Sequence, residues 1–275
     1  MQTRYQNQPQ GSARIDAGTA LSQYLSSVWV PGLDTINQSG ASAICLDRKG
    51  NSHLVTATGG GRTRAYGPQG VFYADTGTGF VTGNLAKSIT AFPLVFIVAG
   101  YFSNGSSGWT LAAINTSGGG GGSSRCDIIL VSATEIDYNI RNNFGTIATV
   151  AGTGLSNVTS GAFFTCVAQS LSATDHRLYI NGTQYTSATN MGAMTNPYVS
   201  MAIGGQATGG AVTANLAGGV LFAATGTIAL PDKMALELSA SPRMFWQMFP
   251  RQSGRYRYMA GAAAAADNLF AQACL

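Results

Sequence analysis

Between residues 27 and 230 the chain consists of short apolar runs separated by clusters of Gly, Asn, Ser and Thr. Runs such as SAICL, GVFYA, CDIILVS and AFFTCVA are rich in β-branched and aromatic residues, which is typical of strands. Many short strands with turn signals between them predict a sandwich or a barrel. We therefore predict an all-β chain, organised as one large β-domain with tails.

Two segments predict how individual strands are buried. Residues 135–140 alternate strictly between polar and apolar side chains, with Ile136, Tyr138 and Ile140 on one face, as expected of a half-buried strand. Residues 94–102 are apolar throughout, which favours a central strand covered on both sides. Asn181-Gly182 between two strand-like runs predicts a tight hairpin, because both residues tolerate the positive φ angles of a type I′ turn.

The composition limits the classes of partner. The chain has 36 glycines, 45% hydrophobic and only 9% charged residues, and a formal net charge of +4. Solubility must then come from hydroxyl and amide groups, which suits a surface that touches protein or sugar. The charge is too small and too scattered for a nucleic-acid footprint, so nucleic acid is an unlikely partner. The longest apolar stretch, 91–102, is too short to span a membrane.

The four cysteines, at 45, 126, 166 and 274, form no C-x-x-C pair, so we expect free thiols rather than a zinc or redox motif. The N-terminal decapeptide MQTRYQNQPQ has no apolar core of the kind found in signal peptides. We expect a soluble protein made in the cytoplasm. We also expect no cofactor.

The ends of the chain differ from its middle. Residues 1–18 are rich in Gln and Asn and have no period, which predicts an extended N-terminal arm. Residues 19–255 hold the strands, and residues 256–275 form an Ala-rich tail that needs a partner surface to stay helical. Pro231-Asp232 predicts the start of one short helix that ends before Pro242.

The last part of the strand region has a recognisable order. The hairpin HRLYINGTQY is followed by VSMAIGG, ANLAGGVLFAATG and IALPDKMALELSASPRMFWQMFPR. This order resembles the C-terminal half of concanavalin A-like, laminin G-type jelly rolls of tailed-phage structural proteins, in which a Tyr-x-Asn-Gly hairpin precedes the last strands, and a short helix ending in Leu-Ser leads to a Pro-aromatic segment. The segment QGSARIDAGTALSQYL is similar to their lead-in, although the usual Trp is missing and Ala17 follows Asp16.

The resemblance implies an antiparallel two-sheet jelly-roll sandwich with a concave face, located on the exterior of a virion. On this basis we expect a structural component of a tailed phage, most simply a tail-side appendage, such as a fibre or accessory protein, that also contacts host glycans. A head decoration or cement protein is the alternative. We expect contacts with other virion proteins and homo-oligomerisation.

The candidate partner-binding residues lie at the two ends of the chain. The aromatic cluster after the helix either caps one end of the sandwich or docks another virion protein, and the Arg–Tyr alternation after it suits an acidic protein surface. The residues are Arg4, Tyr5, Met244, Phe245, Trp246, Phe249, Arg255, Arg257, Leu269 and Phe270.

The segment TEIDYN, residues 134–139, is the candidate for chemistry. Related glucanases carry Glu-x-Asp-x-Glu on one strand, and Glu135 and Asp137 match the first two positions. The third position is Asn139, which cannot deliver a proton to a leaving oxygen. We therefore predict no enzyme, with a glucanase-like hydrolase as a remote alternative. The plainer interpretations are a solvated strand face, a sugar contact or a calcium contact.

Sugar binding has further candidates. Tyr66 and Trp109 are candidate aromatic platforms, and Glu135, Asp137 and Asn139 are candidate polar contacts, although single aromatic residues in strands are more often core. His53 and His176 are isolated in the sequence, which favours surface or structural roles. No compact oxygen-rich loop predicts a metal site.

Overall fold

The computed structural model describes residues 19–31, 35–37, 43–49, 54–56, 64–67, 70–73, 80–81, 85, 87–102, 108–116, 125–142, 146–194, 196–208, 211–213, 216 and 218–240. The expected arm, the expected tail and all ten candidate partner-binding residues lie outside these ranges. They are Arg4, Tyr5, Met244, Phe245, Trp246, Phe249, Arg255, Arg257, Leu269 and Phe270.

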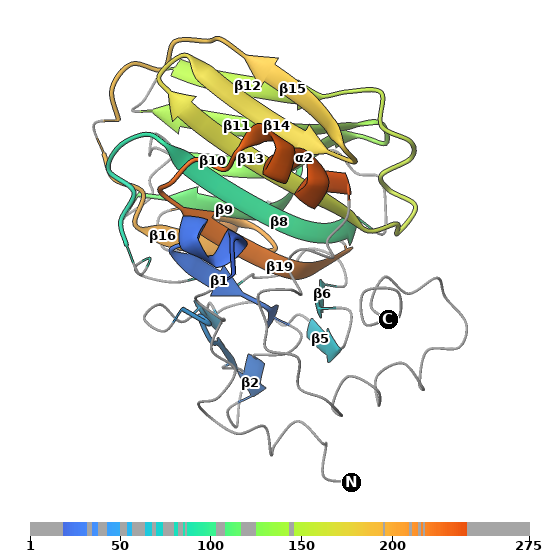
Figure 1. The fold of residues 1–275 in the computed structure, drawn as a ribbon. Coiled ribbons are helices and arrows are strands. Elements are labelled where there is room, and N and C mark those ends of the chain that lie inside the picture. Colours follow the sequence, from blue (N-terminus) through green and yellow to red (C-terminus); the bar gives the residue numbers. More distant parts are fainter. Residues whose placement is uncertain are drawn as a thin grey trace, which may run out of the picture.

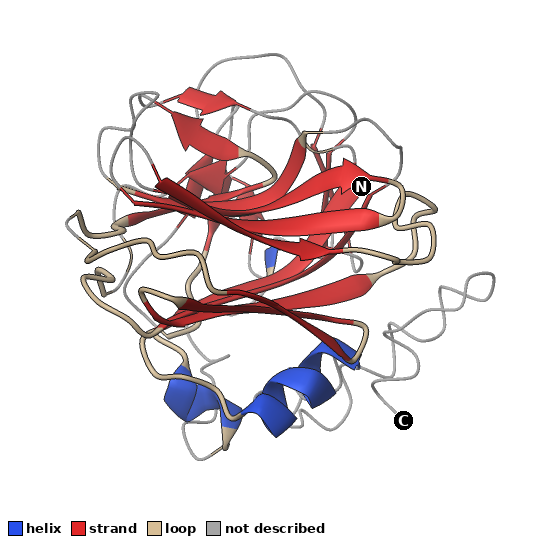
Figure 2. Ribbon diagram, turned by 90° about the horizontal axis from the view of Figure 1, so that it is seen from above, coloured by secondary structure: helices blue, strands red, loops and turns tan. Residues whose placement is uncertain are grey.

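Two antiparallel sheets stack face to face (Figures 1 and 2). We call the first sheet A. Its strand order is β15 (Thr183–Ser187), β14 (Asp175–Ile180), β13 (Phe164–Ser172), β8 (Leu94–Phe102), β19 (Gly218–Gly226), β6 (Gly70–Tyr73) and β5 (Arg64–Gly67), and β1 (Ser27–Trp29) also pairs with β19.

The second sheet, sheet B, has nine strands. Their order is β12 (Thr146–Gly152), β11 (Glu135–Asn142), β10 (Arg125–Ser132), β9 (Trp109–Asn115), β16 (Ser200–Ile203), β7 (Phe80–Val81), β4 (Leu54–Thr56), β3 (Ala43–Cys45) and β2 (Thr35–Asn37). A separate two-stranded hairpin, β17 (Gln206–Thr208) with β18 (Ala211–Thr213), packs against β9.

The main core lies between the sheets and takes alternate residues from each strand. Sheet B contributes Ile136, Tyr138 and Ile140 from β11, all at most 1% exposed. From sheet A, β8 points Phe96 inward, while its neighbour Ile97 belongs to a second core on the opposite face. Both faces of β8 are therefore buried, which explains why its sequence is apolar without alternation.

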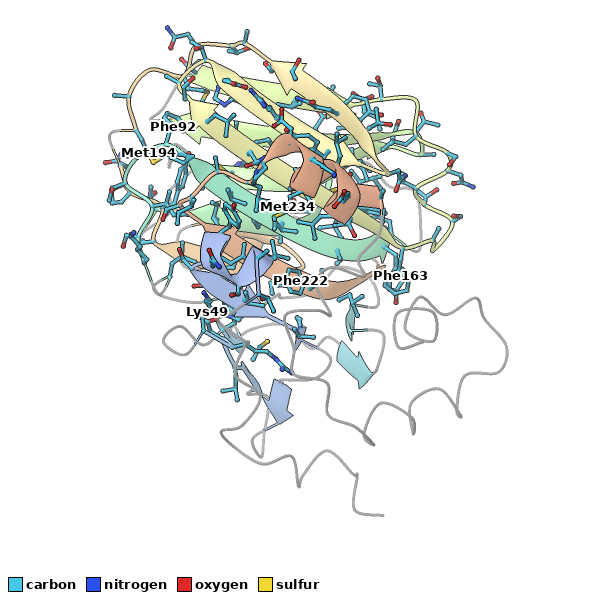
Figure 3. All side chains as sticks on the ribbon, in the orientation of Figure 1. Lys49, Phe92, Phe163, Met194, Phe222 and Met234 are labelled. Carbon is cyan, nitrogen blue, oxygen red and sulfur yellow. The ribbon has the colours of Figure 1, made fainter. Side chains whose placement is uncertain are left out.

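The second core covers the outer face of sheet A. Two helices lie on this side (Figure 2): the 3-10 helix η1 (Leu21–Tyr24) and α2 (Asp232–Ala240). From α2, Ala235 and Leu238 are buried against the sheet, and Met234 packs beside the same cluster as Phe222 of β19 (Figure 3). The outer face of sheet A is thus used for packing.

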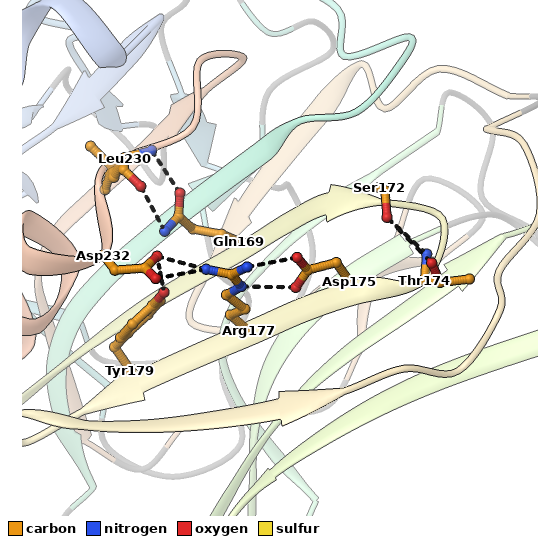
Figure 4. Close-up of polar contacts among 8 residues, drawn as sticks. All are labelled: Gln169, Ser172, Thr174, Asp175, Arg177, Tyr179, Leu230 and Asp232. Atoms are coloured by element: carbon orange, nitrogen blue, oxygen red, sulfur yellow. Dashed lines mark hydrogen bonds and ion pairs between the residues drawn. The ribbon is translucent and has the colours of Figure 1, made fainter.

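Polar contacts fix α2 at both ends. At its start, the Arg177 guanidinium donates to both carboxylate oxygens of Asp232, at 2.7 and 2.9 Å, and also holds Asp175 through two hydrogen bonds (Figure 4). At its end, the Gly182 amide of the β14–β15 turn donates to Ser239 Oγ at 3.0 Å. The helix is therefore clamped across β14.

The hairpins β10–β11 and β13–β14 are built alike. Each has a Cys, then Ser-Ala-Thr six residues later, then Ile fourteen residues after the Cys; the first hairpin starts at Cys126 and the second at Cys166. In both, the Cys pairs with that Ile across the hairpin and a register shift precedes the turn. In both turns the Thr amide donates to the Ser hydroxyl at 3.2 Å. One hairpin lies in each sheet, so the sandwich contains an internal repeat.

The structure confirms the antiparallel two-sheet sandwich with one short α-helix, whereas the jelly-roll connectivity stays a prediction. The Asn181-Gly182 turn has φ angles of 51° and 76°, as predicted. Cys45, Cys126 and Cys166 are buried, and none of the three forms a disulfide. Among the described helices, none is both long and apolar enough to cross a membrane.

Candidate ligand-binding face

The outer face of β9 to β12 in sheet B carries aligned polar side chains. The strand register places Asn115, Arg125 and Arg141 in one row across β9, β10 and β11. The next row holds Asp127 beside Asn139. We call this surface the polar face; its members are Asn115, Arg125, Asp127, Glu135, Asp137, Asn139, Arg141 and Thr149.

These side chains point outward because their neighbours along each strand point inward. On β11 the core takes Ile136, Tyr138 and Ile140, so the residues between them face away from the other sheet. A one-residue change of register would put charges into the core, and the apolar residues therefore fix the orientation of the polar face.

The polar face is covered at one side and open at the other. On β9 and β16 the outward-facing residues are buried, Asn115 and Ser200 among them, and β17 packs against β9. On β12 the outward-facing Ile147 and Thr149 are exposed. The accessible part of the polar face therefore lies over β11 and β12.

Asp127 lies at the boundary between the covered and open parts. Its side chain is fully buried and forms an ion pair with Arg125, with 2.9 Å between Nε and Oδ2. Burial raises the pKa of Asp127, while Arg125 and a hydrogen bond from Asn139 act in the opposite direction. Asn139 in turn accepts a hydrogen bond from Thr149 Oγ1 at 2.8 Å. Asp127 thus orients the side chains of Arg125 and Asn139.

Asp137 is a second carboxyl group of the polar face with a raised pKa. Burial, together with the negative charges of Glu135 and Asp127, raises its pKa to about 6. The residue is 9% exposed, and its Oδ1 atom has no hydrogen-bond partner within the described part of the chain. Ionised Asp137 therefore costs the folded state free energy at neutral pH.

One amide group and one guanidinium group of the polar face also lack hydrogen-bond partners among the described residues. The side-chain amide of Asn115 is 1% exposed, and neither its oxygen nor its nitrogen forms a hydrogen bond in the described ranges. Arg141 is half-buried, and no described residue accepts a hydrogen bond from its guanidinium group. A buried polar group without a partner is expensive. Such groups gathered on one surface indicate a place where a polar ligand completes the contacts.

The structure brings some of the predicted site residues together and separates others. Glu135, Asp137 and Asn139 share the polar face, as the alternation predicted. Trp109 is only 9% exposed and belongs to the core between the sheets, so it is not a platform on this face. Tyr66 lies in β5, in the other sheet.

Sequence reasoning missed Asn115, Asp127 and Arg141. A signal for two of them is present in RCDIILVSATEIDYNIR, because folding this segment about its Ser-Ala-Thr turn pairs Asp127 with Asn139 and Arg125 with Arg141. Nothing in the sequence alone indicates that Asn115 joins the row, since β9 is separated from β10 by the glycine-rich segment.

The buried hydroxyl and imidazole groups of the core have a structural role. Ser170 Oγ lies 3.0 Å from both the Tyr138 hydroxyl and His176 Nδ1, and His176 Nε2 faces the carbonyl oxygens of Ala173 and Thr189. These partners fix the tautomer: Nε2 donates to the carbonyls, so Nδ1 accepts from Ser170. Burial lowers the pKa of His176. The chain of hydrogen bonds links sheet B to sheet A.

Burial also makes the thiol groups of the core unreactive. Burial raises the pKa of Cys126 to about 12 and that of Cys166 further still, and a thiol without thiolate character is a poor nucleophile. Within the described ranges, no three His, Cys, Asp or Glu side chains are grouped so that they could hold a metal ion.

Of the comparisons with known proteins, the one with solved structures finds matches, and these matches concern the fold alone. No family model matches the chain, and no curated protein matches it. Among solved structures, the sialidase of Trypanosoma rangeli in complex with sialic acid matches with a TM-score of 0.58 and 13% identity, over 81% of this chain and 33% of that chain. The same enzyme in complex with 2,3-difluorosialic acid matches with a TM-score of 0.57 and 14% identity, over 86% and 35%.

A sialidase CBM40 domain of Ruminococcus gnavus bound to α2,3-sialyllactose matches at a TM-score of 0.44 and 14% identity, over 55% of this chain and 84% of that chain. The present chain spans about a third of the length of the Trypanosoma sialidase chains. At these identities the likeness to the Trypanosoma chains shows a common β architecture.

Proposed function

We propose that the protein is a non-enzymatic binding module whose polar face holds a saccharide, and that it serves on the exterior of a tailed-phage virion. The observation that carries the first part concerns two groups on the accessible part of one sheet face that have no hydrogen-bond partner among the described residues: the buried Asp137 Oδ1 and the half-buried Arg141 guanidinium. Such groups lower the stability of the unliganded chain, and a ligand that pairs with them recovers this free energy.

A saccharide fits the chemistry of this surface. Its hydroxyl groups both donate and accept hydrogen bonds, and the polar face offers acceptors at Glu135 and Asp137 and donors at Asn139 and Arg141. These four groups occupy every second residue of β11, about 6.8 Å apart at 3.4 Å per residue, so a saccharide laid along the strand passes them in turn. The exposed Ile147 beside Arg141 adds an apolar contact for the face of a ring.

The arrangement of the carboxyl groups favours binding over hydrolysis. A retaining glycosidase needs two carboxyl groups about 5 to 5.5 Å apart, with the scissile bond between them. Here the third position of the strand pattern is Asn139, which has no proton to deliver to a leaving oxygen. The third carboxyl group, Asp127, is buried and engaged by Arg125. We expect no release of reducing sugar from β-glucans.

The virion role is supported by the resemblance to laminin G-type jelly rolls of phage structural proteins. The Asn181-Gly182 hairpin and the helix Asp232–Ala240 occur where that family has them. We favour a tail-side appendage that assembles with other virion proteins as a homo-oligomer, with a head decoration protein as the alternative. Copies per particle distinguish the two, because a tail component follows three-, six- or twelvefold symmetry and a decoration protein follows the capsid lattice.

The saccharide function is tested with two matched variants. Glu135→Gln removes a charge from the polar face, and Glu237→Gln removes one from the solvent side of α2, where the Glu237 side chain is 52% exposed. We expect glycan-array and calorimetric binding to weaken about tenfold or more for Glu135→Gln and to stay unchanged for Glu237→Gln. Equal binding by both variants, or native protein that binds no saccharide, would disprove the proposal.

A further inference from the structure

We infer that the saccharide is acidic and that it lies along β11 with its carboxylate at Arg141. This inference rests on the proposed function and makes it more specific. Three observations carry it: the position of Arg141 opposite another arginine, the open end of that row at Ile147, and the concentration of carboxyl groups at the other end of β11.

Arg141 is a cation without a matching anion. It lies directly across the hairpin from Arg125, and like charges directly opposite each other in a sheet are destabilising. Arg125 is compensated, because its Nε contacts Asp127 at 2.9 Å. Arg141 attracts Asp127 only at longer range, and no described residue forms an ion pair with it. An anion bound at Arg141 would remove the repulsion between the two arginines.

The row that contains Arg141 is suited to a carboxylate. A guanidinium group binds a carboxylate through two parallel N–H donors, and Ile147, which pairs with Arg141 and is 42% exposed, leaves this end of the row open to solvent. At the covered end of the row, Ser200 donates its hydroxyl to the Asn115 backbone oxygen at 3.2 Å, so the accessible end of the row is at Arg141 and Ile147.

The carboxyl groups fix the direction of the ligand. Glu135 and Asp137 lie near the start of β11 and Arg141 near its end, which places Glu135 and Arg141 about 20 Å apart at 3.4 Å per residue. This length accommodates a short oligosaccharide. A carboxylate placed at Glu135 would be repelled, whereas neutral hydroxyls there would donate to the carboxylate oxygens. The acidic residue of the ligand therefore lies at Arg141 and the neutral sugars lie toward Glu135.

The test compares one ligand with and without its charge. A trisaccharide that ends in a uronic acid and the same trisaccharide after carboxyl reduction are titrated calorimetrically into the full-length protein. We expect the acidic form to bind at least about tenfold more tightly. Arg141→Ala should abolish this ratio, and Arg141→Lys should retain part of it because the charge remains without the planar fork. A third arm with a sulfated trisaccharide reports whether any anion suffices.

The matched control is Lys233→Ala, which removes a positive charge that is 88% exposed on α2, on the outer side of the other sheet. It should leave the ratio unchanged, and thermal unfolding confirms that each variant is folded. If neutral and acidic trisaccharides bind equally, if Arg141→Ala keeps the preference, or if sulfate is preferred to carboxylate, the inference is wrong while saccharide binding stands. If no trisaccharide of any kind binds, the proposed function fails as well.

Discussion

Replacing Asp137 by Asn should stabilise the protein and weaken its binding of saccharide. In the folded state the Asp137 carboxyl group is buried beside Glu135 and Asp127, and its pKa is raised to about 6 from an ordinary value of 3.8. A raised pKa means that the folded chain holds the proton more tightly than the unfolded chain. The stability that the proton contributes is present below pH 3.8 and is lost as the pH rises through 6.

The size of the effect follows from the two pKa values. One pKa unit corresponds to about 1.4 kcal/mol, so the shift corresponds to about 3 kcal/mol lost at pH 7.5. The neutral amide avoids this loss but gives up the hydrogen bonds that ionised Asp137 makes with water through its remaining exposure of 9%. We expect a net gain of about 1–3 kcal/mol at pH 7.5, equivalent to a rise in Tm of several degrees. At pH 4.5 the gain should fall to about a third of this.

The assay is thermal and urea unfolding of both proteins at pH 7.5 and 4.5. The control is Asp175→Asn, at a residue whose pKa is lowered by its hydrogen bonds to Arg177. This variant should destabilise the protein slightly at pH 7.5, by less than about 1 kcal/mol, because Asp175 is partly exposed. The two identical substitutions thus have opposite signs. Destabilisation by Asp137→Asn at pH 7.5, or an equal effect at both pH values, would refute the reasoning.

Two further variants test the core and the helix clamp. Ser170→Ala leaves the Tyr138 hydroxyl and His176 Nδ1 buried without their shared partner, so urea unfolding should show a loss of about 2–4 kcal/mol; a loss no greater than that of the exposed Ser156→Ala would contradict this. Arg177→Met removes the hydrogen bonds that hold the start of α2 and should speed amide hydrogen exchange in α2 but not in β11, with a stability loss of about 1 kcal/mol. Unchanged exchange in α2 would show that apolar packing alone holds the helix.

The sequence predicts the local features of this fold better than it predicts which strands pair and how the sheets pack. The alternation of Ile136, Tyr138 and Ile140 correctly predicts which side of β11 is buried, because the core imposes a strict period of two. The short helix and the Asn181-Gly182 turn are equally local. The position of Trp109 in the core, by contrast, depends on how β9 packs against the opposite sheet. The amino-acid composition of β9 does not reveal this packing.

The polar face was only partly predictable for the same reason. Glu135, Asp137 and Asn139 lie on one strand, so their common face follows from spacing alone. Asp127 and Arg141 join them through the pairing of β10 with β11, which requires the position of the turn. The pKa of Asp137 depends on neighbours from two strands and on burial, and burial is a property of the assembled sandwich.

The internal repeat shows how the outer faces of the two sheets differ in the described part of the chain. The hairpins β10–β11 and β13–β14 have the same turn and the same inward Cys and Ile pair, but their outward residues differ. In β14 the outward residues Arg177 and Tyr179 both contact Asp232 and hold α2 in place. The equivalent residues in β11 are Asp137 and Asn139.

No described helix covers those residues of β11. One copy of the hairpin thus uses its outer face to bind part of its own chain, whereas the other keeps charged and amide groups that its own chain does not fully satisfy. A side chain retained only for stability would be neutralised or paired, as Asp175 is by Arg177. The unpaired and destabilising state of Asp137 is therefore better explained by selection for a ligand than by selection for the fold.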